Sequence, residues 1–243
     1  MPAPDLQLSS VELETADGPA RAYLATPSTP ATGAVVIIPE AFGLNDHIES
    51  VARRFARDGF VAVGLDMFHR SGIGVIPYDD GSRILEFSAG LDDPAFLMDF
   101  DAASAHLATL GFPASQQSIV GFCVGGRFAF LAALRRQLGA AISYYGGGIV
   151  QQGFFKALPP LLDEVASLKT PWLGLFGDLD KSIPIDDVEL LRTSLGDAKV
   201  RSEIVRYAEA NHGFNCDARP SFNEEASNAA FDRSTTWLHE HLG

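Results

Sequence analysis

One cysteine stands where a strand is expected to turn sharply into a helix. Cys123 is the centre of Gly121-Phe122-Cys123-Val124-Gly125-Gly126, between the β-rich residues 118–120 and a helical pattern that starts at Arg127. A G-x-nucleophile-x-G turn lifts its central side chain clear of a sheet, and its glycines permit the tight backbone. The dipole of the following helix favours a thiolate at this position. Free cysteines are usually small buried apolar residues, but this context predicts a nucleophile.

A thiol nucleophile needs a nearby base and an acid that orients the base. Among the six histidines, His212 is the best placed, because it lies on the loop after the last expected strand. We expect His47 to be exposed at the start of a helix. The other histidines lie in helices or in an irregular segment: His69, His106, His239 and His241.

The acid is expected on the loop after residues 172–176, which form a buried apolar strand pattern. That loop reads Gly177-Asp178-Leu179-Asp180-Lys181-Ser182-Ile183-Pro184. Asp178 and Asp180 are both available there, and one of them is an ordinary loop or helix-capping residue. The pattern by itself does not decide between the two.

These residues depend on elements that alternate along the chain. Strand patterns cover residues 6–14, 20–26, 34–38, 60–65, 117–122, 140–145, 172–176 and 201–207, and helix patterns cover residues 46–57, 94–110, 125–138, 184–195 and 222–241. This alternation predicts one α/β domain, residues 1–243, with a mostly parallel, doubly wound sheet flanked by helices. In such sheets the active site lies at the carboxyl ends of the strands. Residues 67–93 break the pattern and are expected to form a lid or substrate wall, as a functional loop or as a partly helical cover.

Composition excludes several classes of partner. The chain has 243 residues, 47% of them hydrophobic, and a net charge of −13, which disfavours nucleic acid and anionic membranes as partners. The first residues lack the pattern of a signal peptide, and the apolar runs are too short to span a membrane. Two cysteines make no disulfide framework and no zinc-ligand spacing is present. We therefore expect a cytoplasmic protein with no metal or cofactor, as a monomer or small homo-oligomer.

Taken together, the motifs resemble the dienelactone hydrolase (carboxymethylenebutenolidase) family over residues 6–242. The matching segments are residues 39–45 (PEAFGLN), 121–126, 144–146 (YYG), 177–184 and 212–214. The resemblance implies an α/β-hydrolase fold, with Asp180 as the acid that orients His212. It also implies that the backbone N–H groups of Ala41 and Val124 form the oxyanion hole, and that Glu40 contacts the resting thiol. Phe42 and Tyr144 are candidate substrate-binding residues.

Two departures from the family pattern concern the substrate. Members that act on dienelactone carry an arginine four residues after the histidine, where it grips the substrate carboxylate, and this chain has Cys216 there. It also has Gly213 where those members have serine. Arg83 is the best candidate for a second carboxylate-binding arginine, and Arg219 could compensate if its loop folds inward. Without such compensation, we expect neutral or weakly polar substrates.

The sequence thus predicts hydrolysis of an ester or lactone through a thioester on Cys123. Activated esters and lactones suit a thiol nucleophile better than peptides do, because an amine leaves poorly compared with a thiolate. A second interpretation is a promiscuous carboxylesterase or a hydrolase of other activated esters, including phosphate triesters. A third, of a different class, is a non-catalytic protein that binds small molecules.

Overall fold

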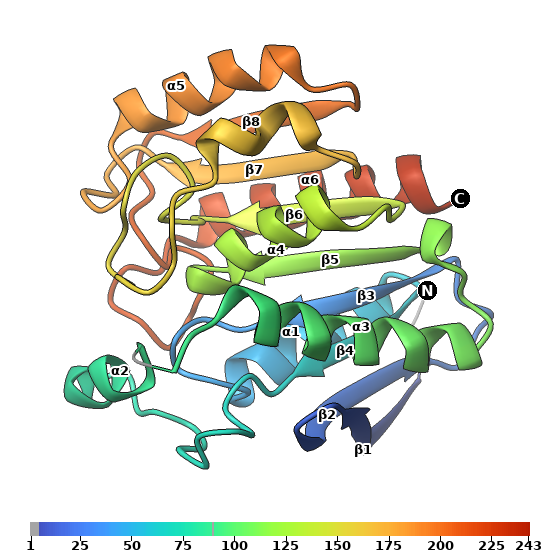
Figure 1. The fold of residues 1–243 in the computed structure, drawn as a ribbon. Helices are drawn as coiled ribbons and strands as arrows, with labels where there is room; N and C mark the ends of the chain where they lie inside the picture. The colour runs from blue at the N-terminus through green and yellow to red at the C-terminus, as the bar shows by residue number, and fades with distance from the viewer. Residues whose placement is uncertain (1–4, 89) are drawn as a thin grey trace.

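Eight strands form one sheet in the order β1-β2-β4-β3-β5-β6-β7-β8 (Figure 1). The structure is a computed structural model and describes residues 5–88 and 90–243. β1 pairs with β2 and β2 with β4 in antiparallel fashion, and the other neighbours run parallel. The strands are β1 Leu6–Thr15, β2 Gly18–Pro27, β3 Gly33–Ile38, β4 Phe60–Leu65, β5 Gln117–Phe122, β6 Ala140–Tyr144, β7 Trp172–Gly177 and β8 Ser202–Tyr207.

The central strands are buried on both faces, as their continuous apolar runs predict. Every residue of β3 to β7 is buried. Figure 1 shows α3 and α4 on the face toward the viewer and α1 and α6 behind the sheet. The helices are α1 Asp46–Arg57, α2 Gly81–Ser88, α3 Asp93–Thr109, α4 Val124–Arg135, α5 Ile185–Ser194 and α6 Glu224–Leu242, with short 3-10 turns η1 Ala114–Gln116, η2 Leu162–Ser167 and η3 Leu195–Asp197. The predicted α/β architecture with a mostly parallel sheet is confirmed.

Side-chain caps fix where three of the helices begin. Asn45 accepts a hydrogen bond from the Ile48 N–H at 3.1 Å, and Asp92 accepts one from Ala95 at 2.9 Å. Asn223 caps α6 in the same way. Such caps satisfy backbone donors that have no partner inside the helix. α1 therefore starts directly after the loop that follows β3, close to the carboxyl end of that strand.

The segment between β4 and α3 is a partly helical cover, one of the two predicted alternatives. It contains α2 and passes the end of the sheet at the left of Figure 1. Phe68 packs edge-on against Phe87 with ring centroids 4.1 Å apart. At its end, the Asp93 carboxylate accepts two hydrogen bonds from the buried Arg127 guanidinium, at 2.6 and 2.9 Å. A bidentate pair of this kind is specific in geometry, so it ties the cover to the helix that follows Cys123.

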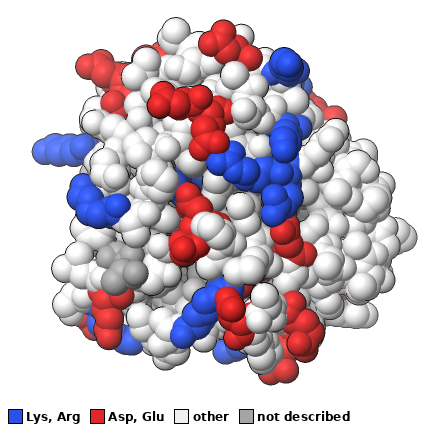
Figure 2. Space-filling view, in the orientation of Figure 1, with Lys and Arg blue, Asp and Glu red and all other residues white. Residues whose placement is uncertain are grey.

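Acidic and basic side chains alternate on the face over α3 and α4 (Figure 2). Arg135 pairs with Glu164 at 2.6 Å and Arg136 with Asp101 at 2.7 Å. These pairs are largely exposed, so each contributes little to stability. No described helix combines the length and the apolar character that a membrane crossing requires.

Candidate active site

The turn at Cys123 is fixed by backbone contacts on both sides. Cys123 itself adopts φ 56° and ψ −120°, a conformation that residues other than glycine rarely take. A Cβ on Gly125 would lie 2.5 Å from the carbonyl oxygens of Ile38 and Pro39, and one on Gly126 would lie 2.7 Å from the oxygen of Tyr144. The glycines thus allow α4 to start hard against β3 and β6, and the thiol projects from the end of the sheet.

His212 and Asp180 meet across two loops at that end. The Asp180 carboxylate accepts a hydrogen bond from His212 Nδ1 at 2.6 Å. Its other oxygen accepts from the N–H of Ser182 at 2.9 Å and from the Ser182 hydroxyl at 2.5 Å. The sulfur of Cys123 lies close enough to His212 to raise the pKa of its imidazole. Asp178 faces elsewhere, because its carboxylate binds Arg206 at 2.7 and 2.9 Å. Of the two candidate acids, Asp180 is the one beside His212.

Cys123, His212 and Asp180, here called the trio, have electrostatics that favour a charged imidazole on His212. Burial alone would lower the pKa of His212, but the sulfur of Cys123 and the Asp180 carboxylate outweigh it and raise that pKa to about 10. Burial would likewise raise the pKa of Asp180, yet the hydrogen bonds from His212 and Ser182 lower it. The raised pKa favours a protonated His212 beside the Asp180 carboxylate.

Two backbone N–H groups border the thiol. Ala41 and Val124 both line the cavity that contains Cys123. Val124 is the first residue of α4, so its N–H has no partner within the helix. Among residues 5–88 and 90–243, no hydrogen bond from either N–H to a protein acceptor is recorded. Both donors are therefore available to an oxygen bound next to the sulfur.

A cavity of about 270 Å³ opens above the trio. Its walls are Ala41, Phe42, Ile84, Cys123, Val124, Arg127, Gly147, Gly148, Gly153, Phe154, Phe155, Leu158, Ser182, His212 and Arg219. Most of these side chains are apolar, with a few polar groups among them, as in small-molecule sites generally. The apolar part comes from the loop after β3, from the start of α4, from Ile84 of α2 and from residues 154–158 of the loop after β6.

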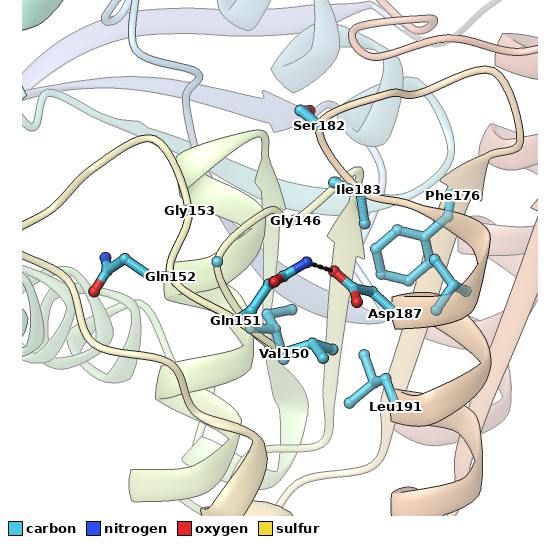
Figure 3. A pocket seen from close by; sticks show the side chains of 13 residues that line it. Gly146, Val150, Gln151, Gln152, Gly153, Phe176, Ser182, Ile183, Asp187 and Leu191 are labelled. Atoms are coloured by element: carbon cyan, nitrogen blue, oxygen red, sulfur yellow. Dashed lines mark hydrogen bonds between the residues drawn. The ribbon is translucent and has the colours of Figure 1, made fainter.

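A smaller hollow of about 60 Å³ lies next to this cavity and shares Gly148, Gly153 and Ser182 with it. Figure 3 shows the side chains of Gln151 and Asp187 joined within it by a hydrogen bond of 2.5 Å. This contact ties the loop after β6 to α5.

An arginine enters the cavity from the loop after β8. The Arg219 guanidinium donates to the Glu40 carboxylate at 3.0 Å and lies over the Phe42 ring, 5.5 Å from its centroid. Glu40 is only 2% exposed, so this ion pair is largely shielded from water. Gly213 makes the approach possible, since a Cβ there would lie 2.6 Å from Cζ of Arg219. Arg219 thus points inward. This is the condition under which we expected it to take the place of the carboxylate-binding arginine that Cys216 replaces.

The other predicted residues take varied positions. Phe42 lines the cavity. Tyr144 does not, because its ring is buried behind the elbow and its hydroxyl is 2.7 Å from Ser234 Oγ. Arg83 donates to the Ile73 carbonyl at 2.8 Å within the cover and does not line the cavity either.

The prediction that His47 is exposed is wrong, since its side chain is 6% exposed. It packs edge-on against Phe122, and this long-range contact could not be read from its place at a helix start. The expected contact between Glu40 and the thiol stays a prediction. In the described chain the Glu40 carboxylate accepts a hydrogen bond from Arg219.

Sequence reasoning did not assign Ser182, Arg127 or the residues of the 153–158 loop to the site. Ser182 had a local signal, because an Asp-x-Ser pair often forms this side-chain-to-backbone turn. Arg127 and residues 153–158 had no such local signal, because their place in the site depends on contacts with segments far away in the chain.

The fold and the cysteine elbow with its histidine and aspartate define an α/β-hydrolase. The chain belongs to the dienelactone hydrolase family, whose model matches residues 20–242. A Yersinia pestis protein provisionally named carboxymethylenebutenolidase is 34% identical, covering 90% of this chain and 83% of its own. A Salmonella typhimurium protein of the same provisional name is 33% identical, covering 97% and 87%.

A solved structure gives the same result. The crystal structure of a Klebsiella pneumoniae protein, provisionally named a dienelactone hydrolase, superposes with a TM-score of 0.89 at 31% identity. The match covers 97% of this chain and 99% of that one. Family membership makes this protein a hydrolase that acts on ester or lactone bonds.

Proposed function

We propose that this protein hydrolyses activated esters and lactones through a covalent thioester on Cys123. His212 is the base and general acid, and Asp180 holds its ring in place. The observation that carries the proposal is the contiguous Cys123–His212–Asp180 arrangement at the floor of a largely apolar cavity. A nucleophile, a base within reach and an orienting acid are the parts that acyl transfer needs.

The reaction follows from these positions. The Cys123 thiolate attacks the carbonyl carbon, and the carbonyl oxygen takes up the negative charge between the N–H groups of Ala41 and Val124. When the C–O bond breaks, the alcohol or enol oxygen leaves with the proton of His212. Neutral His212 then takes a proton from water, whose oxygen attacks the thioester. The carboxylic acid leaves, and the sulfur and imidazole regain their charged state.

Trapping the thioester tests this proposal. We expect a mass increase equal to the acyl group on Cys123 when an activated ester is mixed with the protein and quenched in acid. Cys123→Ala should carry no adduct, and Cys216→Ala should carry the same adduct as the wild type. Ester turnover without any adduct, together with undiminished turnover by Cys123→Ala, would refute the covalent mechanism.

The cavity also favours a particular charge on the substrate. We propose that Arg219 binds a carboxylate of the substrate in exchange for Glu40, while the aromatic and aliphatic walls hold the apolar part. Arg219 is 21% exposed and faces the cavity, so a ligand can reach it. The relatives' provisional name, carboxymethylenebutenolidase, denotes a lactone with such a group. This proposal replaces the preference for neutral substrates expected from Cys216 alone.

Comparing two substrates tests the charge preference. Charge-assisted hydrogen bonds contribute roughly 1.5–3 kcal/mol, so Arg219→Ala should lower kcat/KM for a carboxylate-bearing lactone by about 10- to 100-fold. A neutral ester with the same leaving group should lose less than about 3-fold, and Arg83→Ala, the matched control in the cover, should change neither. Equal losses on both substrates would mean that Arg219 only supports the fold.

A further inference from the structure

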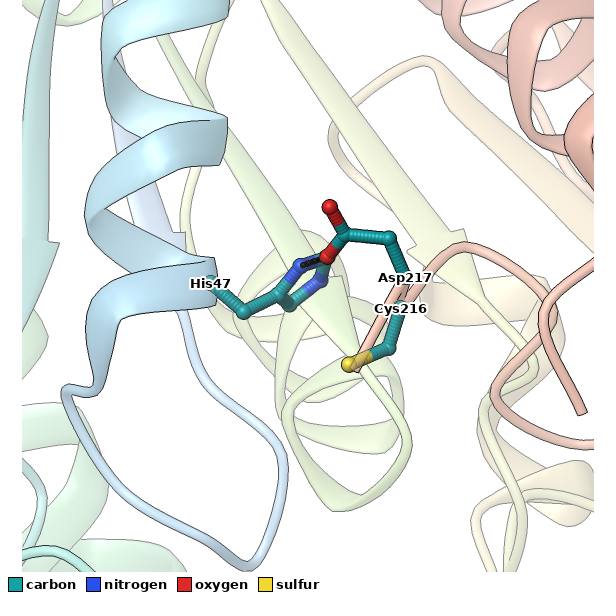
Figure 4. Close-up of side chains that lie close together, drawn as sticks. All are labelled: His47, Cys216 and Asp217. Atoms are coloured by element: carbon teal, nitrogen blue, oxygen red, sulfur yellow. Dashed lines mark ion pairs between the residues drawn. The ribbon is translucent and has the colours of Figure 1, made fainter. Parts of the chain in front are cut away.

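Three potential metal ligands lie together outside the residues that the reaction uses. His47 is the second residue of α1, and Cys216 and Asp217 lie on the loop between His212 and α6. Each offers one donor atom, and the three donors lie within 4.8 Å of one another. Figure 4 shows the imidazole of His47 reaching from the helix toward both side chains of the loop.

Two of the three side chains are buried and the third is exposed. The His47 side chain is 6% exposed and Cys216 is buried, whereas the Asp217 side chain is 75% exposed. Within the described chain, His47 Nε2 is buried and has no hydrogen-bond partner. The other ring nitrogen, Nδ1, lies 3.4 Å from Asp217 Oδ1 and is the atom available to an ion shared with the loop.

We propose that His47, Cys216 and Asp217 form a binding site for a borderline-soft divalent cation of the Zn²⁺ class. A thiolate and a carboxylate together balance the charge of the ion, and imidazole is a common third ligand. Exposed Asp217 gives the ion an entry path from solvent and leaves a position for water.

Ion binding requires the three donors, now within 4.8 Å of one another, to draw closer, and the Cys216 thiol to give up its hydrogen bond to the Tyr78 hydroxyl at 3.1 Å. With bonds of about 2.0–2.3 Å, a tetrahedral ion keeps its donors about 3.5 Å apart. His47 Nδ1 and Asp217 Oδ1 are already 3.4 Å apart. Because Asp217 is exposed, its side chain can follow an ion that settles nearer to Cys216.

The charged groups around the cluster have mixed signs. Glu40 lies close enough to influence both His47 and Cys216, and its negative charge favours a cation. Arg54 acts on His47, and Arg219 acts on Cys216, in the opposite sense. Arg219 is already paired with Glu40, which reduces its repulsion.

An ion at this position would join two segments that carry the active site. The loop of Cys216 and Asp217 also bears His212 and Arg219, and α1 follows directly on the loop that contains Glu40 and Ala41. Binding should therefore stabilise the folded protein as well as give a spectroscopic signal.

The test uses the full-length Cys123→Ala variant, which lacks the other thiol. Co²⁺ is the spectroscopic probe, and Zn²⁺ serves as its competitor. We expect one equivalent of Co²⁺ to produce a thiolate-to-metal charge-transfer band that Zn²⁺ abolishes. At ion concentrations about 100-fold above Kd, Tm should rise by about 5–10 °C.

Three further substitutions in this background locate the ion. Cys216→Ser should abolish the charge-transfer band, and Asp217→Asn, an exposed change that is safe for folding, should weaken binding by about 10-fold or more. His239→Gln is the matched control, because His239 and Asp58 form an exposed pair at 3.3 Å without a thiol. An unchanged band and Tm shift in Cys216→Ser, or no saturable Co²⁺ binding in the parent variant, would overturn the proposal.

Discussion

The elbow around Cys123 and the wall around Arg219 border the same cavity but are built in different ways. The elbow is a backbone structure, in which glycines allow β3, β6 and α4 to touch and Cys123 takes a left-handed φ of 56°. The wall is made by side chains from distant segments. Arg219 meets Glu40 across 179 residues of sequence and lies over the ring of Phe42.

Because of this difference, we expect the elbow to govern the chemical step and the wall to govern which substrate is preferred. The elbow presents the nucleophile in one position and tolerates almost no change in its glycines, since an added Cβ would meet backbone atoms. The wall depends on side chains that can exchange partners, such as the guanidinium of Arg219. Substitutions in the two regions should therefore have distinct signatures: in the elbow and triad, loss on every substrate, and in the wall, loss that depends on the substrate.

The largest effect is expected for Cys123→Ala. Removal of the nucleophile should lower kcat/KM by at least about 1000-fold for charged and neutral esters alike. Tm should change by only about 1–2 °C, because the side chain is small and only partly buried. Steady-state kinetics on both substrates and thermal unfolding check this. Residual turnover above about a hundredth of the wild type would remove Cys123 from its assigned role.

A second large effect distinguishes the two aspartates. Asp180→Asn should lower kcat by about 100-fold or more, because the ring of His212 loses the acceptor that holds it. Asp178→Asn breaks the pair with Arg206 instead and should cost less than about 3-fold. Measurements of kcat on one neutral ester suffice. A larger loss in Asp178→Asn would transfer the role of the acid to Asp178.

The sequence predicted the elbow and the order of the elements because these features depend on local patterns. The run of residues 121–126 and the apolar strands require only neighbours in the chain, and the structure has them where they were expected. Arg219 could be named only as a conditional candidate, because its inward position depends on Gly213 and on the distant Glu40. The burial of His47 also depends on a contact with Phe122, which is far away in sequence.

A moderate effect is expected where the two regions meet. In Gly213→Ala, the new Cβ would collide with the Arg219 guanidinium, and the backbone at φ 78° disfavours alanine as well. We expect kcat/KM for a carboxylate-bearing lactone to fall by about 10-fold, with a smaller loss for a neutral ester. Gly59→Ala is the control for backbone strain, because Gly59 also has positive φ but a Cβ there meets no atom. An unchanged ratio of the two kcat/KM values would show that Gly213 does not position Arg219.

The smallest effect concerns stability and pH. Burial would lower the pKa of His212, but Cys123 and Asp180 raise it to about 10, above the value of about 6.5 typical of an unfolded chain. The folded state therefore holds this proton more tightly, and the resulting stability is fully present below about pH 6.5 and lost as the pH rises through about 10. The difference in Tm between the wild type and His212→Gln should accordingly shrink between about pH 6.5 and pH 10.

His239→Gln provides the comparison for this measurement, because that histidine forms only an exposed pair with Asp58 and its removal should leave the pH profile of Tm almost unchanged. The Cys123→Ala protein should lose part of the effect, since the sulfur is the first of the groups that raise the pKa of His212. If the Tm difference between wild type and His212→Gln stays constant across this pH range, then His212 is not held as a cation between Cys123 and Asp180. The trio would then resemble the wall, with interchangeable side-chain contacts, more than the fixed elbow beside it.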